Sequence, residues 1–262
     1  MPERAKTGMA DVNGTKLYYE LRGVGPSLIL IPGAEGDAEE YLRVAELLDD
    51  QFTVLTYDRR GFSRSPRPAG YAGTTVDRQA DDAAALLTAI ELSPAGVWGN
   101  SSGAIIGLSL VLRYPELVRW AMLHEPPLFA GMSDPRGNLT FLKEATANGK
   151  VPFLRMLTGD AVYNGFSPGY QSRLAADDTW IKHEFDNFEY YRPADSELAA
   201  VKRPVAVLFG AESPPFFGEA ATWLAARLGT QALTIPGGHG AHYDKPQEVA
   251  KAIREFAPGP AH

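Results

Sequence analysis

The 262-residue sequence contains no cysteine. This excludes a disulfide framework, a thiolate zinc site and a cysteine nucleophile. Basic residues are also scarce, 25 against 32 acidic ones, and the net charge of −7 disfavours nucleic acid as a partner. No stretch reaches the roughly 18 consecutive apolar residues typical of a membrane span. The first residues, MPERAKTGMADVNG, lack the apolar run of a signal peptide. We therefore expect a cytoplasmic protein that has neither nucleic acid nor membrane as a partner.

The sequence does contain a regular alternation of short apolar runs and helical patterns. Apolar residues make up 45% of the chain, which is ordinary for a globular protein. Apolar runs typical of strands occupy 16–22, 27–32, 52–57, 95–99, 117–124, 204–210 and 231–235, and helical spacing occupies 37–49, 75–92, 102–114, 216–228 and 246–256. Strands that alternate with helices predict an α/β fold, in which helices cover both faces of a mostly parallel sheet.

Residues 126–200 interrupt this alternation. They favour helix, are rich in aromatic residues and contain no clear strand. One interpretation is a packed helical subdomain and nothing more. The segment lies between two predicted strands. It also follows the G-x-S-x-G motif at residues 99–103, which predicts a reactive site at the edge of the sheet. We therefore expect a helical cap inserted over a pocket. The predicted organisation is a core of residues 1–125 and 201–262 and a cap of residues 126–200.

The most specific motif is G-x-S-x-G, formed by Gly99-Asn100-Ser101-Ser102-Gly103. A predicted strand precedes it and a helix of small residues follows it, which is the strand–turn–helix setting of a nucleophile elbow. The two outer glycines keep side chains out of a tight turn. We expect Ser101 to be a nucleophile at the carboxyl edge of the sheet. A serine–glycine turn without chemistry is the alternative.

A serine hydroxyl needs a base, and the sequence offers His124, His183, His239, His242 and His262. His239 lies in the glycine-rich loop PGGHGAHYDKP after the last predicted strand, from which an imidazole can reach Ser101. His242 is its competitor, and His124 could be a buried core histidine. We expect His239 to be the base.

The base in turn needs an acid that orients it. In α/β enzymes with this motif, the customary acid is the third residue after the glycine that ends the strand at 204–210. That residue is Ser213, which cannot serve, and Glu212 comes one position too early. Glu125 follows the neighbouring strand at the same sheet edge. We expect Glu125 to orient His239, with a hinge residue paired to an arginine as the alternative.

Two backbone amides are candidate oxyanion donors. The Ser102 N–H opens the helix after the motif, where amides are free and the helix dipole favours negative charge. The Ala34 N–H lies in the loop Pro32-Gly33-Ala34-Glu35-Gly36, after the strand at 27–32.

Other charged residues predict structural roles. We interpret Asp58-Arg59-Arg60 as ion pairs that fix a loop, and we expect Asp58 and the run Asp77, Asp81 and Asp82 to lie on a solvated face. The sequence shows no cluster with metal-ligand spacing and no phosphate-binding glycine loop, so we expect no metal and no cofactor.

The segments IPGAEG, YDRRGFSRS, WGNSSG and GGHGAHYDKP, in this order, resemble the α/β-hydrolase superfamily over nearly the whole chain. Within it, WGNSSGA followed by YPELVRWAMLHEPP resembles the fungal zearalenone lactone hydrolases and their bacterial relatives. The resemblance implies Ser101 as nucleophile, His239 as base and Glu125 as acid, and it matches Trp180 to a substrate-contacting tryptophan. Ala34 stands where those lactonases carry glycine. The match in the cap is poor, so the lactone substrate does not carry over.

Two classes of function follow from these residues. The first is a serine hydrolase that cleaves an apolar carboxylic ester or lactone through an acyl-enzyme. The second is a small-molecule sensor that keeps the triad and turns over slowly or not at all. Carbon–carbon bond hydrolysis and perhydrolysis can use the same triad, whereas the Asp nucleophile of dehalogenases and epoxide hydrolases is absent. The sequence is also compatible with a homodimer.

Overall fold

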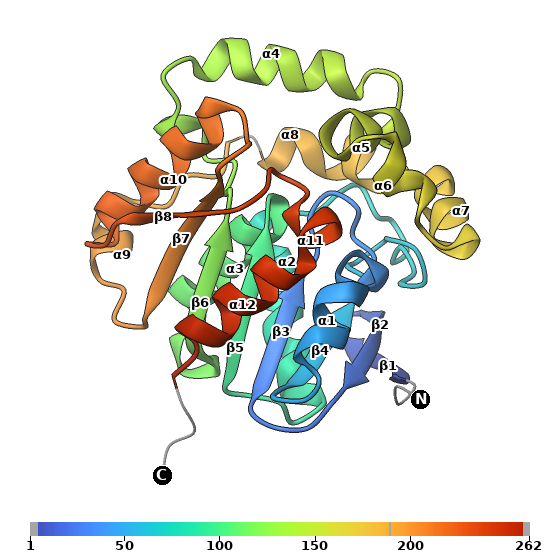
Figure 1. Cartoon of the computed structure of the whole chain (residues 1–262). Helices are drawn as coiled ribbons and strands as arrows, with labels where there is room; N and C mark the ends of the chain where they lie inside the picture. Colours follow the sequence, from blue (N-terminus) through green and yellow to red (C-terminus); the bar gives the residue numbers. More distant parts are fainter. Residues whose placement is uncertain (1–4, 189, 259–262) are drawn as a thin grey trace.

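A computed structural model describes residues 5–188 and 190–258 (Figure 1). Its eight strands form one sheet in the order β1-β2-β4-β3-β5-β6-β7-β8. All neighbours from β4 to β8 are parallel, while β1 and β2 form an antiparallel edge. The predicted fold class is confirmed. The strands are β1 (Lys6–Val12), β2 (Thr15–Arg22), β3 (Ser27–Ile31), β4 (Thr53–Tyr57), β5 (Ala95–Asn100), β6 (Val118–His124), β7 (Val205–Gly210) and β8 (Ala232–Ile235).

Helices cover both faces of this sheet, as the alternation of side chains along the central strands requires. On β3, Ile29 and Ile31 pack in the cluster that contains α2 (Val76–Ala89), α3 (Ser102–Arg113) and α10 (Pro215–Arg227). The intervening Leu28 and Leu30 pack in the cluster that contains α1 (Leu42–Leu48) and α12 (Pro246–Phe256). Strands buried on both faces explain the continuous apolar runs of the sequence.

The structure differs from the sequence prediction in one helix and in one additional strand. The helical pattern at 37–49 divides into a short 3-10 helix, η1 (Ala38–Tyr41), followed by α1. The strand β1 was not predicted, because four of its seven residues are exposed and it shows no apolar alternation. It is held by its register with β2, from Lys6 opposite Leu21 to Val12 opposite Thr15.

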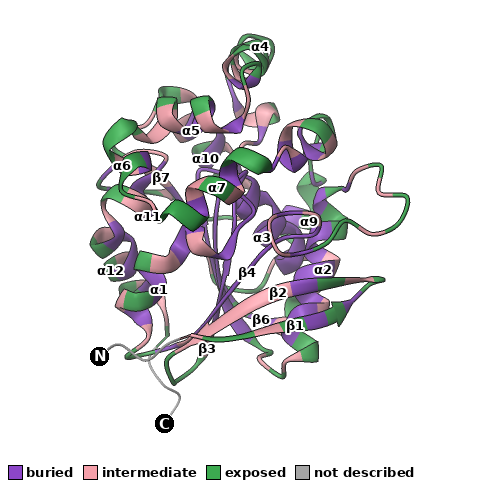
Figure 2. Ribbon diagram, turned by 90° about the vertical axis from the view of Figure 1, so that its right-hand side faces the viewer, coloured by how far each residue is buried: buried purple, intermediate pink, exposed green. Residues whose placement is uncertain are grey.

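The helices of the 126–200 segment lie beyond the carboxyl ends of the strands, in the upper part of Figure 1, except for the last, α9 (Asp195–Ala199), which lies lower at the left. They are η3 (Phe129–Gly131), α4 (Pro135–Thr146), α5 (Lys150–Thr158), α6 (Asp160–Asn164), α7 (Pro168–Ala176), the π-helical turn η4 (Trp180–Glu184), α8 (Phe185–Phe188) and α9 (Asp195–Ala199). Figure 2 shows that α4 is mostly exposed, whereas the central strands are buried and the edge strands β1 and β2 are partly exposed.

Two short helices complete the core, η2 (Pro115–Leu117) and α11 (Ala241–Asp244). Within the described residues, no helix combines the length and the hydropathy needed to cross a bilayer.

Candidate active site

Ser101 occupies a sharp turn between β5 and α3. Its φ of 54° and ψ of −125° are strained for a residue with a side chain. The turn depends on the two outer glycines of the motif. A Cβ on Gly99 would lie 2.2 Å from the Gly103 carbonyl oxygen, and a Cβ on Gly103 would lie 2.1 Å from the Ile31 carbonyl oxygen. The local sequence therefore folds as the motif predicts, with Ser101 in the geometry of a nucleophile elbow.

His239 and Glu125 meet at the same edge of the sheet. The Glu125 Oε2 atom lies 2.5 Å from the His239 Nδ1 atom, and the Glu125 Oε1 atom accepts a 2.7 Å hydrogen bond from the Gly210 N–H. Glu125 is fully buried and has a positive φ of 50°, directly after β6. The His239 ring stacks on Phe217, with centroids 4.3 Å apart. Each carboxylate oxygen thus has a fixed partner, and the imidazole is held on two sides.

The surroundings of Glu125 favour the ionised form of its carboxyl group, which is the form that can hold a histidine. Burial alone would raise the pKa of this carboxyl, but the hydrogen bond and the charge of His239 outweigh it. The pKa is lowered to about 2. Glu125 is therefore an anion at neutral pH, and the His239 Nδ1 atom must carry the proton that joins them. This tautomer leaves Nε2 as a hydrogen-bond acceptor.

Neither of the two other positions considered for the acid, 212 and 213, supplies a carboxylate that contacts His239. Ser213, at the customary position, contributes to the wall of the cavity described below. The Glu212 carboxylate is well exposed and forms an ion pair with Lys245. Among the described residues, Glu125 is the carboxylate that contacts His239.

The side chains of the other described histidines have partners other than Ser101, although the His124 backbone carbonyl accepts a 3.0 Å hydrogen bond from the Ser101 N–H. His242 is buried 3.7 Å from Glu40, and burial lowers its pKa well below the usual value. His124 is also buried, with Nδ1 2.8 Å from the Asn100 Oδ1 atom, and burial lowers its pKa to about 4. His183 makes a ring contact with Tyr71. His262 lies outside the described residues.

Ser101, Ser102 and His239 line a cavity of about 270 Å³ between the sheet edge and the 126–200 segment. The rest of its wall is mainly apolar, and Trp180 belongs to it, stacked on Phe153 at a centroid distance of 5.5 Å. Most of the aromatic wall comes from the 126–200 segment, namely Phe129, Phe141, Phe153, Trp180, Phe185 and Phe188. Such a cavity favours an uncharged, apolar ligand.

The two amides predicted as oxyanion donors, those of Ser102 and Ala34, have different surroundings. Ser102 is the first residue of α3, so its N–H has no carbonyl one turn earlier in the helix. Ala34 packs behind the cavity wall, in a cluster with Phe153, Trp180 and Phe185. No hydrogen bond among the described residues uses the Ala34 N–H as donor, although Ala34 is buried.

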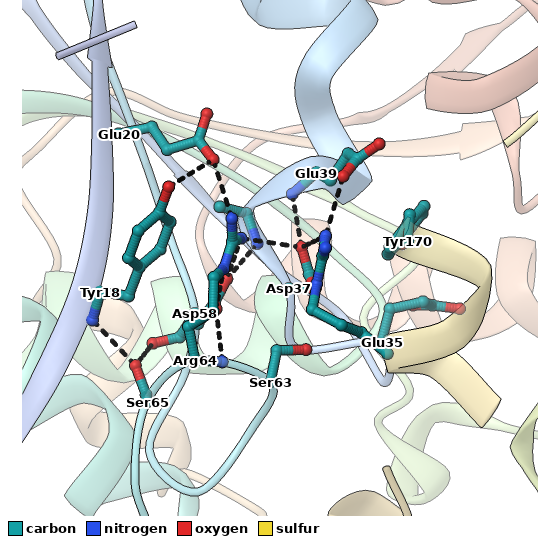
Figure 3. Close-up of polar contacts among 12 residues, drawn as sticks. Tyr18, Glu20, Glu35, Asp37, Glu39, Asp58, Ser63, Arg64, Ser65 and Tyr170 are labelled. Carbon is teal, nitrogen blue, oxygen red and sulfur yellow. Dashed lines mark hydrogen bonds and ion pairs between the residues drawn. The ribbon is translucent and has the colours of Figure 1, made fainter. Parts of the chain in front are cut away.

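Ion pairs fix the loops that follow β3 and β4, as the charged turn at 58–60 predicts. Figure 3 shows Arg64 between the carboxylates of Asp58, Asp37 and Glu20. Asp58 also accepts a 2.7 Å hydrogen bond from the Ala38 N–H. The expectation that Asp58 and Asp82 lie on a solvated face is wrong, because both are fully buried and each is paired with an arginine.

Sequence reasoning missed two further contacts of the site. The Asn100 side chain donates a 3.2 Å hydrogen bond to the His239 carbonyl and accepts one from His124, so it links the elbow to the histidine loop. Arg59 donates a 2.7 Å hydrogen bond to the Gly33 carbonyl, next to Ala34. Neither residue type is diagnostic in a sequence, since these roles depend on contacts across the fold.

The fold and this arrangement define an α/β hydrolase. The family model described as "alpha/beta hydrolase fold" matches residues 26–246. The chain belongs to this family, and the resemblance drawn from its motifs is confirmed at that level.

Two curated relatives match nearly the whole chain. The uncharacterized hydrolase YraK of Bacillus subtilis (strain 168) is 30% identical over 257 residues, 95% of each chain. The zearalenone hydrolase of Bionectria ochroleuca is 27% identical and covers 96% of this chain and 97% of its own. Among solved structures, the carboxylesterase CesB of Bacillus subtilis aligns with a TM-score of 0.75 at 21% identity, over 97% of this chain and 92% of its own. This last likeness supports the fold alone.

Proposed function

We propose that the protein hydrolyses an apolar carboxylic ester or lactone through a Ser101–His239–Glu125 triad. The observation that carries the proposal is the 2.5 Å contact between His239 Nδ1 and Glu125 Oε2, beside a cavity that Ser101 and His239 both line. It fixes the tautomer in which His239 Nε2 can accept a proton from Ser101. A relative named as a zearalenone hydrolase adds support for a lactone or ester substrate.

The reaction then proceeds in two steps. His239 Nε2 takes the Ser101 hydroxyl proton while Oγ bonds to the carbonyl carbon of the substrate, and the carbonyl oxygen becomes an oxyanion held by the Ser102 and Ala34 amides. The bond to the leaving alcohol breaks, and His239 returns the proton to that alcohol. Water then attacks the acyl-enzyme by the same route and releases the carboxylic acid. In a lactone, both products remain in one opened molecule.

The 126–200 segment is the cap in this proposal, and its aromatic wall selects the substrate. Trp180 contacts the apolar part of the ester beside Phe153. The polar residues that line the cavity, namely Ser101, Ser102, Glu212, Ser213 and His239, all come from the core. Uncharged esters should therefore be preferred over those with an anionic acyl or alcohol group, because the wall is mainly apolar and its one charged residue, Glu212, is a carboxylate. The cytoplasmic location stays a prediction from the sequence, and so does the compatibility with a homodimer.

The test is a panel of aryl esters with acyl chains of graded length, together with an apolar macrolactone. We expect steady turnover of neutral members and labelling of Ser101 by a fluorophosphonate. Labelling accompanied by a single burst without turnover would favour the sensor. Labelling with turnover of a β-diketone, or with peracid formation from hydrogen peroxide and a carboxylic acid, in place of ester cleavage would favour carbon–carbon hydrolysis or perhydrolysis.

A further inference from the structure

Arg59 lies at the junction between the Ala34 loop and the 126–200 segment, and it is completely buried. Its Nη2 atom donates a 2.7 Å hydrogen bond to the Gly33 carbonyl, and its backbone N–H donates a 2.8 Å bond to the Gly36 carbonyl. The Gly33 N–H is held separately, by both carboxylate oxygens of Glu40 at 3.0 Å. Hydrogen bonds with side chains thus fix both the N–H and the carbonyl of Gly33.

The Gly33 carbonyl and the Ala34 N–H belong to one peptide group. A trans peptide group is planar, and its C=O and N–H point in opposite directions. A hydrogen bond that fixes the carbonyl toward Arg59 therefore also fixes the direction in which the Ala34 N–H points. The Gly36 N–H also bonds to this carbonyl, but at 3.2 Å and without a charged donor. The guanidinium bond is the shorter, charge-assisted one.

Ala34 is a buried residue, and no group among the described residues accepts a hydrogen bond from its N–H. A buried amide without a partner destabilises the folded state. A substrate oxygen that becomes negative in the reaction would supply the missing partner. The cost in the free protein is then consistent with an amide kept free for that oxygen.

Arg59 is in turn held by the 126–200 segment. Its Nη1 atom contacts both carboxylate oxygens of Glu184, at 3.0 and 2.8 Å, and Glu184 also accepts a 2.6 Å bond from Gln79. Glu184 ends the π-helical turn η4, whose first residue, Trp180, lines the cavity. Such turns are rare in proteins and occur often at functional sites.

We infer that Arg59 is a positioning residue that orients the Gly33–Ala34 peptide for oxyanion stabilisation, and that Glu184 holds Arg59 in place from the cap. The inference rests on the proposed function, since it concerns the donor of the same oxyanion. It also gives a reason for a buried ion pair at this position. An apolar pair of similar size could fill the space, but it could not bind the carbonyl.

The neighbouring arginine provides a matched control. Arg60 is also buried, and it pairs with the buried Asp82 at 2.6 Å, but its side chain contacts the Asn13 carbonyl and not the Ala34 loop. We therefore compare Arg59→Met/Glu184→Gln with Arg60→Met/Asp82→Asn. Each double variant removes one buried ion pair without leaving an isolated charge.

The measurements are kcat and KM on one aryl ester, and the dissociation constant of an aryl trifluoromethyl ketone, which forms a tetrahedral oxyanion adduct with an active serine. For the Arg59 variant we expect kcat to fall and the ketone dissociation constant to rise by the same factor, about 10- to 100-fold, because one oxyanion donor is misaligned. KM should change less than about threefold, since the ground-state carbonyl depends less on this amide. The Arg60 variant should change both quantities less than about threefold.

Glu184→Gln alone keeps the size and one acceptor oxygen of the side chain but removes the charge opposite Arg59, and it serves as a second perturbation of Arg59 beside the double variant. It should shift kcat and the ketone dissociation constant together by about three- to tenfold. Equal losses in the Arg59 and Arg60 variants, or an effect on KM alone, would overturn the inference. A wild-type protein that forms no ketone adduct would overturn the proposed function as well, whereas an adduct of unchanged affinity in the Arg59 variant would overturn this inference only.

Discussion

The Glu125 carboxylate and the His239 imidazole lie 2.5 Å apart, although 114 residues separate them in the chain. Glu125 reaches this position from the end of β6, whereas the customary acid of the fold follows β7, the next strand. Parallel pairing of β6 with β7 brings the two strand ends together. The neighbouring strand can therefore supply the carboxylate where Ser213 cannot.

Replacing Ser101 with alanine should abolish ester turnover and leave the fold intact. Alanine removes the atom that bonds to the substrate, and kcat should fall by about 10⁴-fold or more. The control is the thermal unfolding curve, which should match that of the wild type closely. Wild-type turnover by this variant would show that the reaction uses another group.

The identity of the acid can be tested with two conservative substitutions. Glu125→Gln keeps the size of the side chain but removes the charge that stabilises the imidazolium, so kcat should fall by about 10²- to 10⁴-fold. Glu212→Gln is the matched control and should cost less than about tenfold, because Glu212 pairs with Lys245 and not with His239. Both are assayed on the same ester at the same pH. A large loss of kcat in the Glu212 variant, together with a nearly normal kcat in the Glu125 variant, would show that the acid follows β7 and not β6.

The acid limb of the pH profile should report a single proton. A protonated imidazole cannot accept the Ser101 proton, so kcat/KM should fall as histidine is protonated. The pKa of Glu125 is lowered to about 2, so this carboxylate stays charged over the whole limb. A plot of log kcat/KM against pH should therefore approach a slope of one below its inflection. A profile flat from about pH 5 to 9 would contradict His239 as the base.

His124 should make the free energy of unfolding depend on pH. Burial lowers its pKa from 6.5 to about 4, so the unfolded chain binds a proton at this residue in that window and the folded chain does not. Acidification from pH 6.5 to 4 should therefore cost the folded state about 3 kcal/mol through His124. Urea unfolding of His124→Gln should show a shallower loss over this range. An identical loss in variant and wild type would contradict the buried neutral histidine.

Much of the fold could be predicted from local patterns. The apolar runs at 27–32, 52–57 and 95–99 correspond to central strands because both of their faces are buried. Strand β1 could not be predicted, because an edge strand is stabilised by backbone pairing with β2 and needs little apolar surface.

The site was predictable where its residues stand in short motifs. Ser101 lies in one such motif, and the strand ends placed Glu125 and His239 at the same edge. The contacts of Arg59 with Gly33 and Glu184 join residues 26 and 125 positions apart, so no local pattern reveals them. Burial of Asp58 escaped prediction for a different reason: its partner Arg64 is only six residues away, but whether this pair forms, and so whether the charge can be buried, depends on how the loop folds.

The most direct test of the central claim is to trap the covalent intermediate. Wild-type protein mixed with a p-nitrophenyl ester is quenched in acid during turnover, digested and mapped by mass spectrometry, with Ser101→Ala treated in parallel. We predict one acyl group per chain, attached to the peptide that contains Ser101 and absent from the variant. Steady turnover with no acyl group on Ser101, or with the group on another residue, would contradict the account.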